Sequence, residues 1–372
     1  MNEVILNDFI ELVKIDASSR NERNVADAVK SKMAAFGITL NEDDAGKKIG
    51  GNTGNLFGVL DGGLPSSILL NAHLDRVANG IGIQPIIKDG VIRSDGTTIL
   101  AADDLSGVAA LIDSARRLAS CKEKFPCVEY LFTVGEEAGL LGASVFDTSR
   151  LKSRLGYAFD SPGRLGRIVS AAPGEINITL ETLGKAAHAG NCPEKGVNAV
   201  IALAKLLSGI RDGRLDFEST ANYAVLDCGT KMTNIVQAYA SCKGEMRSHN
   251  AAKITAYAEY LKNYVAEAAK SSPAEIKLDI KEAFKSFSFD ASSQVVNIAL
   301  TVLKEMGVNA FANGGGGGMD ANILNGKGIN VVGIATGYNG NHGVSEQIYV
   351  DDLLRSGELA ARLVLQYGKS NL

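Results

Sequence analysis

Short apolar runs recur along the first and last thirds of the chain, and each is about as long as a buried β-strand. They cover residues 55–60, 68–72, 128–134, 156–159 and 330–335. Helical spacing of apolar residues lies between them, most clearly over residues 105–119 and 292–306. Strands that alternate with helices are typical of an α/β domain. We therefore expect a three-layer α/β domain with a mainly parallel central sheet.

The middle third of the chain has a different pattern. A strand pattern is followed by a helical pattern, two further strand patterns, a long amphipathic helix over residues 251–270 and a last strand pattern. This β-α-β-β-α-β order is that of a ferredoxin-like unit. We therefore expect a discontinuous α/β domain, residues 1–172 and 286–372, with an inserted ferredoxin-like lid domain over residues 173–285.

Composition excludes several classes of protein. The chain has 38 basic and 42 acidic residues, a formal net charge of −4, which gives no sign of a nucleic-acid-binding surface. No apolar run reaches the roughly 18 residues that a membrane span needs. The five cysteines are scattered, and residues 1–4 lack the basic start of a secretory signal. We expect reduced thiols in a cytoplasmic protein that has neither nucleic acid nor membrane as a partner.

Polar residues stand where the expected strands of the α/β domain end or where the neighbouring helix begins. They are His73, Asp75, Asp103, Asp104, Glu136, Glu137, Asp160 and His342. Taken singly, each motif usually has an ordinary explanation, such as a helix cap or a solvated acidic pair. Ligands of open α/β sheets bind at the carboxyl ends of the strands, so the ordered set is expected to converge at one edge.

The residue types in this set suit metal ions. Imidazole and carboxylate groups are good zinc ligands, but two histidines and three carboxylates exceed the three protein ligands that one catalytic zinc takes. They are the right number for two ions that share one carboxylate. Two divalent cations would also offset the charge of a buried acidic cluster, which is very unfavourable without partners. The set therefore predicts a site for two divalent metal ions.

With these motifs, the chain resembles the co-catalytic metallopeptidase family that includes peptidase T, acetylornithine deacetylase and succinyl-diaminopimelate desuccinylase. It is most similar to the peptidase T-like branch. The matching stretches run in the family's order over nearly the whole chain: residues 71–75, 101–104, 135–139, 159–160, 187–190, 193–199, 317–322 and 342. The family's catalytic domain with an inserted lid agrees with the organisation inferred above.

The resemblance implies how the metal ligands are shared. His73 and Asp160 would bind one ion, and Glu137 and His342 would bind the other. Asp103 would bridge both ions, and the peptide bond that follows the bridging residue is typically cis in this family. The ions are expected to be zinc, with cobalt or manganese as alternatives, because ligand type alone does not choose among these metals.

The resemblance also assigns two acids that support the chemistry. Glu136 would act as general base, taking a proton from the attacking water and passing it to the leaving amine. Asp75 would hold the ring of His73 and fix its tautomer. Among the four histidines, His188 would stabilise the oxyanion from the lid, often in the site of a partner subunit, and His249 is expected to be structural.

The resemblance also implies residues that contact the substrate. Arg247 would bind its carboxylate, and Asn234 would contact it. The glycine run at residues 314–318 lacks the Lys-Ser/Thr of a phosphate loop, so we expect Gly317 and Gly318 to approach the substrate closely instead. Arg76 stands where a small or β-branched residue is common in the family, and we expect it to alter the substrate pocket.

These features predict a metal-dependent exopeptidase that hydrolyses short peptides, with a tripeptide aminopeptidase as the favoured activity. An N-acyl-amino-acid amidohydrolase or a carboxypeptidase is the alternative, because the same metal site serves those reactions. A non-catalytic binding protein on this fold is the alternative from another class, and the complete ligand set with Glu136 speaks against it. A homodimer through the lid domain is also expected.

Overall fold

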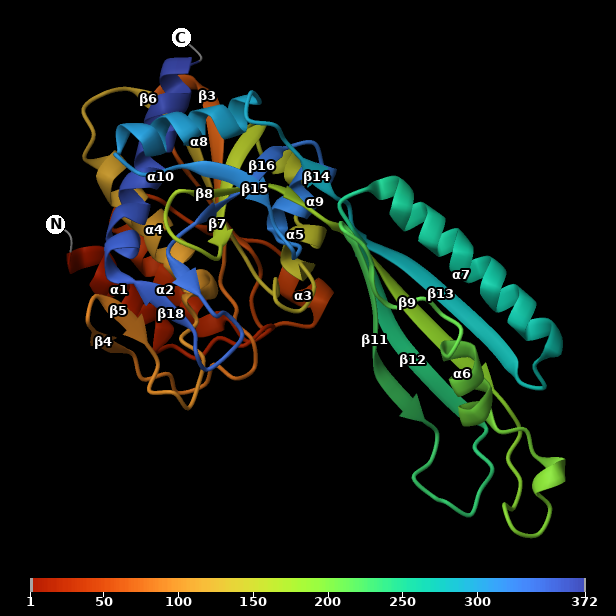
Figure 1. Ribbon diagram of the computed structural model, residues 1–372. Coiled ribbons are helices and arrows are strands. Elements are labelled where there is room, and N and C mark those ends of the chain that lie inside the picture. The colour runs from red at the N-terminus through yellow and green to blue at the C-terminus, as the bar shows by residue number, and fades with distance from the viewer. Residues whose placement is uncertain (1–2, 371–372) are drawn as a thin grey trace. The chain divides into compact units, whose positions relative to one another are not determined.

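Two units make up the structure, a computed structural model that describes residues 3–370. Unit 1 comprises Met1–Ala171 and Ser288–Leu372, and unit 2 comprises Ala172–Phe287. The chain therefore leaves unit 1 once and returns to it once, as the colours of Figure 1 show.

The centre of unit 1 is a nine-stranded sheet. In spatial order its strands are β1 (Asn41–Glu42), β2 (Leu56–Leu60), β6 (Phe125–Thr133), β3 (Gly63–His73), β7 (Leu155–Ser161), β16 (Asn330–Ala335), β8 (Arg167–Ala172) and β14 (Phe287–Ser288), with β15 (Phe311–Gly314) beside β8. The pairs β6–β3, β3–β7 and β7–β16 are parallel. The strand β2 runs antiparallel to β6, and β8 runs antiparallel to β16. The predicted α/β fold with a mainly parallel central sheet is confirmed.

Helices cover this sheet, and a small sheet lies beside it. The longer helices are α1 (Glu3–Val13), α2 (Arg23–Ala34), α4 (Ala102–Ala119), α8 (Gln294–Glu305) and α10 (Val350–Ser370), and the short ones are α3 (Ala45–Ile49), α5 (Leu141–Val145) and α9 (Asp320–Gly326). The small sheet has the order β17 (Tyr338–Asn339), β18 (Gln347–Tyr349), β5 (Val91–Arg93) and β4 (Ile86–Lys88). Within residues 3–370, every helix is too short or too polar to span a membrane.

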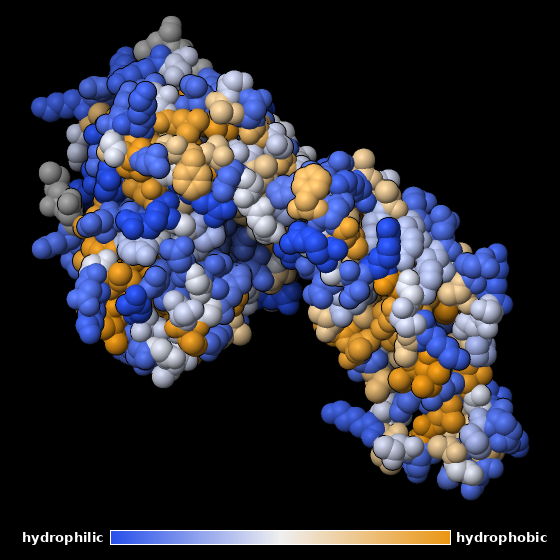
Figure 2. Space-filling model, viewed as in Figure 1, coloured by the Kyte–Doolittle hydropathy of each residue, from blue (hydrophilic) through white to orange (hydrophobic). Residues whose placement is uncertain are grey.

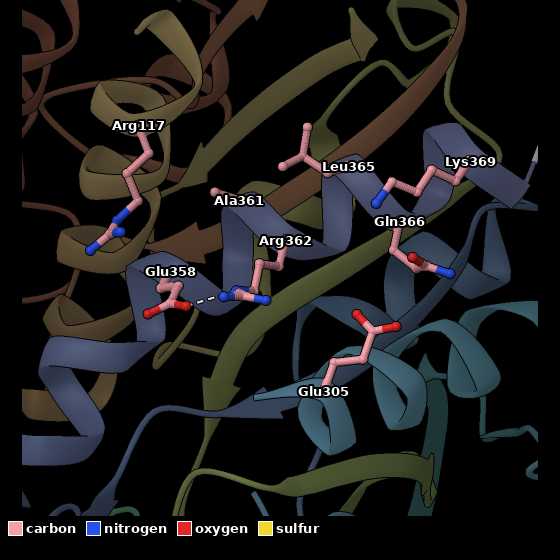
Figure 3. Close-up of a pocket in the computed structure, with 8 residues that line it drawn as sticks. All are labelled: Arg117, Glu305, Glu358, Ala361, Arg362, Leu365, Gln366 and Lys369. Carbon is pink, nitrogen blue, oxygen red and sulfur yellow. Dashed lines mark hydrogen bonds and ion pairs between the residues drawn. The ribbon is translucent and has the colours of Figure 1, made fainter. Parts of the chain in front are cut away.

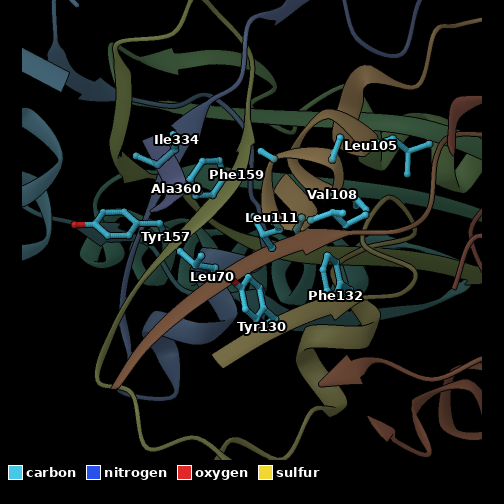
Figure 4. Packing of buried hydrophobic residues seen from close by; sticks show 14 of the residues in the cluster. Leu70, Leu105, Val108, Leu111, Tyr130, Phe132, Tyr157, Phe159, Ile334 and Ala360 are labelled. Atoms are coloured by element: carbon cyan, nitrogen blue, oxygen red, sulfur yellow. The ribbon is translucent and has the colours of Figure 1, made fainter. Parts of the chain in front are cut away.

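The core of unit 1 lies between α4, α10 and the central strands. Leu105, Val108 and Leu111 follow the helical spacing expected for α4, and all three are buried. Figure 4 shows them in the same cluster as Tyr130 and Phe132 of β6. The central strands are apolar along most of their length because both of their faces are covered. Several of their polar residues, among them His73 and Asp160, stand at or near the strand ends, where the candidate site forms.

Unit 2 is an antiparallel sheet with two helices. Along the chain its elements are β9 (Gly174–Leu183), α6 (Ala199–Leu207), β10 (Gly213–Asp216), β11 (Ser219–Cys228), β12 (Tyr239–Ser248), α7 (Ala251–Ser271) and β13 (Glu275–Phe284). The sheet order is β10-β11-β12-β9-β13. Without β10, this is the predicted β-α-β-β-α-β unit. The four-residue β10 was not predicted, because it is too short to show alternation.

Candidate metal centre

The ends of three parallel strands bring the first site residues together. His73 is the last residue of β3, and its partner in the neighbouring strand is Thr133, the last residue of β6. Glu136 and Glu137 follow β6 directly in the next turn. Asp160 lies near the end of β7 on the other side of β3. The predicted convergence at the carboxyl edge of the sheet is present.

Asp103 stands between the two histidines of the set. Its Oδ1 atom lies 3.3 Å from His73 Nε2, and its Oδ2 atom lies 3.4 Å from His342 Nε2. On the His73 side, Nε2 is 3.8 Å from Asp160 Oδ1. On the other side, His342 Nε2 is 3.0 Å from Glu137 Oε1. The two oxygens of one carboxylate thus face two separate groups of ligand atoms.

The donor set fits metal ions. Ligand atoms of His73, Asp103 and Glu137 all lie within 4.8 Å of one another, and so do those of His73, Asp104 and Asp160. The Oε1 atom of Glu137 is buried and accepts no hydrogen bond from residues 3–370, although His342 Nε2 lies 3.0 Å away. A buried carboxylate oxygen without a hydrogen bond is unfavourable, and a divalent cation would satisfy it.

The electrostatics of the site also call for cations. Burial raises the pKa of Glu136 well above its usual range, and nearby Asp160 raises it further. Burial alone would raise the pKa of Asp103, but its hydrogen bonds with His342 and His73 lower it instead. The hydrogen bond with Asp103 in turn raises the pKa of His342 to about 10. Without metal, the carboxylates therefore hold protons on the imidazoles, and a bound cation would replace those protons.

Asp75 connects one histidine to the turn that carries the two glutamates. His73 Nδ1 lies 3.0 Å from the backbone oxygen of Asp75 and 3.4 Å from its carboxylate. The same carboxylate accepts the backbone N–H groups of Glu136 at 2.9 Å and Glu137 at 3.1 Å. It also accepts the Ser19 hydroxyl at 2.6 Å. Asp75 therefore orients more of the site than the single ring that the resemblance implied.

Two neighbours of the ligands were missed by the sequence analysis. Asn341 Nδ2 donates a hydrogen bond to Asp103 Oδ2 at 2.8 Å, and the Tyr338 hydroxyl donates one to Asp160 Oδ1 at 3.2 Å. Asn341 directly precedes His342 in the chain, and this proximity was the one signal available. Tyr338 gave no signal, because its partner lies 178 residues away in the sequence.

The Asp104 carboxylate lies close enough to the site to be a metal ligand, but it accepts hydrogen bonds from the backbone. Its Oδ2 atom accepts the backbone N–H of His73 at 3.1 Å, and its Oδ1 atom accepts that of Gly107 at 3.2 Å. The peptide bond between Asp103 and Asp104 is cis, as the resemblance implied. We therefore retain Asp103 as the candidate bridging residue and assign Asp104 to the support of β3.

The expectation that Arg76 alters the substrate pocket is wrong. Its side chain is fully buried and points to the carboxyl end of α1. The guanidinium donates hydrogen bonds to the backbone oxygens of Val13 at 2.9 Å and Gly80 at 3.2 Å, and also to that of Ile15. Arg76 thus satisfies carbonyl groups that the end of a helix leaves free.

The residues expected to contact substrate are more exposed. His188 is exposed, and its Nδ1 atom accepts the backbone N–H groups of Gly190 at 3.1 Å and Asn191 at 3.2 Å. Asn234 in unit 2 and Gly317 in unit 1 are exposed, and Gly318 is half-buried.

Arg247 has partners within its own unit. Its Nη2 atom lies 2.9 Å from Glu175 Oε2, and its Nε atom lies 2.8 Å from Glu245 Oε1. His188, Asn234 and Arg247 all belong to unit 2, whereas every candidate metal ligand belongs to unit 1.

A separate hollow lies on the surface of unit 1 (Figure 3). Its volume is about 330 Å³, and its lining comes from α4, α8 and α10. Two of its charged residues, Glu358 and Arg362, pair with each other at 2.7 Å. On α4, Arg117 is about 18 Å along the helix axis from Leu105, which follows the Asp103–Asp104 pair. This hollow is therefore not part of the candidate metal centre.

Comparison with known proteins gives two domain matches and several relatives. Residues 171–273 match the peptidase dimerisation domain of the M20 type, and residues 55–200 match peptidase family M28. The crystal structure of aminopeptidase PepT from Bacillus cereus is 35% identical, covers 98% of both chains and has a TM-score of 0.87. A tripeptidase from Staphylococcus aureus is 31% identical over 100% of this chain and 98% of that one, with a TM-score of 0.89. The uncharacterised YqjE of Bacillus subtilis is 34% identical over 98% of both chains.

Proposed function

The chain belongs to the peptidase T-like members of the M20 metallopeptidase family, and on this premise we propose that it is a tripeptide aminopeptidase with two metal ions per chain. The observation that carries the proposal is the position of Asp103 between His73 and His342. One carboxylate that faces two histidines from its two oxygens suits a bridging ligand. Two relatives with solved structures that are more than 30% identical are described as an aminopeptidase and a tripeptidase, which supports the substrate class.

In this proposal, each ion has its own ligands besides the shared Asp103. His73 and Asp160 hold one ion, and Glu137 and His342 hold the other. Zinc is the proposed metal, and cobalt or manganese would suit the same ligands. When bound, a pair of divalent ions lowers the pKa of a water molecule and polarises the scissile carbonyl.

The residues of the chain supply the proton transfer and the orientation. Glu136 is buried beside the ligands, with Oε2 3.9 Å from His73 Nε2. It would accept the proton of the attacking water and deliver it to the leaving amine. Asp75 would keep the His73 ring in its ligating tautomer.

Five further residues are proposed to contact the substrate. His188 would stabilise the developing oxyanion. Arg247 would bind the substrate carboxylate in place of its present ion pair with Glu175 or Glu245. Asn234, which belongs to unit 2 like His188 and Arg247, would also contact the substrate. The exposed backbone at Gly317 and Gly318 would lie along the peptide.

A metal analysis and a hydrolysis panel test this function. The panel compares free di- and tripeptides with N-blocked peptides and N-acetyl amino acids, each with zinc, cobalt or manganese supplied. We expect two ions per chain and the fastest cleavage for tripeptides with a free N-terminus. A steady content of one ion would contradict the shared carboxylate, and preference for N-acetyl amino acids or N-blocked peptides would favour the amidohydrolase or carboxypeptidase alternative.

We also propose that the protein forms a homodimer through unit 2, which contains the dimerisation-domain match. β10 pairs with β11 through residues 219–221, and residues 222–228 of β11 extend beyond it with Val225 and Leu226 exposed. Beside this edge, α6 and β11 line a largely apolar hollow of about 290 Å³, and Figure 2 shows hydrophobic surface on unit 2. A monomer in sedimentation velocity at micromolar concentration would contradict the proposal, and Leu226→Asp should dissociate the dimer.

The proposed place of action is the cytoplasm. All five cysteines are free thiols in the structure, as a reducing compartment allows. Cell fractionation with detection of the protein tests this assignment, and recovery outside the cytoplasmic fraction would contradict it.

A further inference from the structure

A buried carboxylate joins the two turns that carry Asp103 and His342. Glu346 is 1% exposed and lies four residues after His342. Its Oε2 atom accepts the backbone N–H groups of Leu100 and Ala101, both at 2.9 Å. Its Oε1 atom accepts the backbone N–H of Asp103 at 3.0 Å. One side chain therefore holds three amides of the segment that presents the candidate bridging residue.

Both of the joined turns contain a residue in an unfavourable backbone conformation. Ala101 has φ 59° and His342 has φ 65°, in the left-handed region that residues with a Cβ atom rarely adopt. Such conformations persist where the surrounding structure holds them. At Ala101, the hydrogen bond from its backbone N–H to the Glu346 carboxylate helps to maintain this conformation.

The position of Glu346 is itself fixed. Its backbone N–H donates to the Gly343 oxygen at 3.0 Å, which closes the turn after His342. The next residue begins β18, where Gln347 pairs with Arg93 of β5 and Asn339 of β17. The backbone of Glu346 is thus anchored beside the small sheet, while its carboxylate holds residues 100–103 at the start of α4.

We propose that Glu346 is a positioning residue that fixes Asp103 relative to His342 and thereby sets the affinity of the site for metal. The inference rests on the proposed two-metal function. It assigns no contact between Glu346 and the ions, because both of its oxygens are occupied by backbone amides.

The three hydrogen bonds require an acceptor at both oxygens of Glu346. Both of its oxygens act as acceptors, so an amide at this position would turn a donor toward a backbone N–H. Glu346→Gln should therefore loosen the Asp103 turn although it keeps the size of the side chain. Glu346→Asp keeps both oxygens but withdraws them by about 1.5 Å, one carbon–carbon bond, and should loosen the turn as well.

Glu129 of β6 provides a matched control. It is also a buried carboxylate that accepts backbone amides, those of Lys152 at 2.8 Å and Ser153 at 2.9 Å. It lies four residues before Thr133, the partner of His73, or about 13 Å along the strand. Glu129→Gln thus makes the same chemical change away from the metal ligands.

The experiment is a calorimetric zinc titration of chelator-treated wild type, Glu346→Gln and Glu129→Gln, with folding checked by circular dichroism and thermal unfolding. Residues that orient metal ligands typically change affinity 10- to 100-fold, so we expect at least one ion to bind about 10-fold more weakly or worse in Glu346→Gln. Glu129→Gln should bind like the wild type.

The outcomes separate the two proposals. A folded Glu346→Gln with wild-type affinity for both ions would overturn the positioning role while leaving the two-metal function intact. A wild-type protein that binds no zinc would overturn the proposed function and this inference with it. If Glu346→Gln does not fold, the titration is made on Glu346→Asp, and wild-type affinity there would equally overturn the role.

Discussion

The two units hold their polar side chains in different ways. In unit 1, the candidate ligands are mostly buried, and several have a further partner, as Asp103 has in Asn341 and Asp160 has in Tyr338. In unit 2, His188 is exposed and its ring is held by two backbone amides of its own loop. The first arrangement holds the side chains by buried contacts, whereas the second holds an exposed ring by hydrogen bonds within one loop.

The difference indicates a division of tasks. A metal site must hold several charged groups against their mutual repulsion, and this requires burial and many supporting hydrogen bonds. A side chain that meets a flexible peptide can complete its contacts when the substrate binds. Substitutions at the buried acids of unit 1 should therefore change proton transfer, metal binding or stability, and substitution of His188 in unit 2 should slow turnover without changing the metal site.

The largest expected effect concerns Glu136, the proposed general base. Glu136→Gln keeps the shape of the side chain but cannot accept a proton. We expect kcat to fall by about 10²–10⁴-fold, the usual contribution of a general base. The metal content, measured by elemental analysis, should stay that of the wild type. Near-normal turnover would remove Glu136 from the chemistry and weaken the contrast between the units.

A smaller effect is expected in unit 2. His188→Ala should lower kcat by about 10²-fold, as for the loss of one oxyanion donor, and should change KM much less. His249→Ala is the matched control, because it removes the other histidine of this unit without touching the proposed contact. Steady-state kinetics on a tripeptide measure both. Equal kcat in the two variants would return His188 to a structural role.

An effect on stability alone, with none expected on the chemistry, concerns a buried acid of unit 1 outside the ligand set. Glu22 is fully buried, and its Oε1 atom accepts the backbone N–H groups of Arg20 at 2.8 Å and Gly135 at 2.9 Å. Burial, followed by the charge of Asp75, raises its pKa from 4.5 to about 7. A carboxyl with a raised pKa in the folded state destabilises that state as pH rises between these values.

Glu22→Gln should remove this part of the pH dependence. Relative to the variant, the metal-free wild type should lose up to about 3 kcal/mol of unfolding free energy as pH rises from below 4.5 to above 7. Urea unfolding at several pH values measures the difference. Parallel pH curves for the two proteins would show that Glu22 does not titrate in this way.

Local pattern was sufficient for the large elements of the fold. The apolar runs and the helical spacing of α4 reflect burial that each segment experiences along its own length, so they are visible in the sequence. The strands β4, β5, β17 and β18 have only two or three residues and show no period.

The candidate site was less visible where it depends on distant partners. The motif residues could be identified from the sequence because they stand at strand ends, and the topology of a parallel sheet brings such ends together. The direction of the Arg76 side chain follows from where α1 ends in space, which no local pattern contains. The bond of Glu346 to Leu100 spans 246 residues and was invisible for the same reason.

The discontinuity of unit 1 has a consequence for how the protein is made. In the large sheet, β16 lies between β7 and β8, although β7 and β8 are close neighbours along the chain. During synthesis, at about 5–20 residues per second, all of unit 2 leaves the ribosome before β16 and His342 do. The inserted unit has its own core and can fold while the sheet still has a gap at its centre. The candidate metal centre is therefore completed only when the C-terminal part of the chain arrives, so nascent chains that stop early carry the segment that matches the dimerisation domain without the complete candidate ligand set.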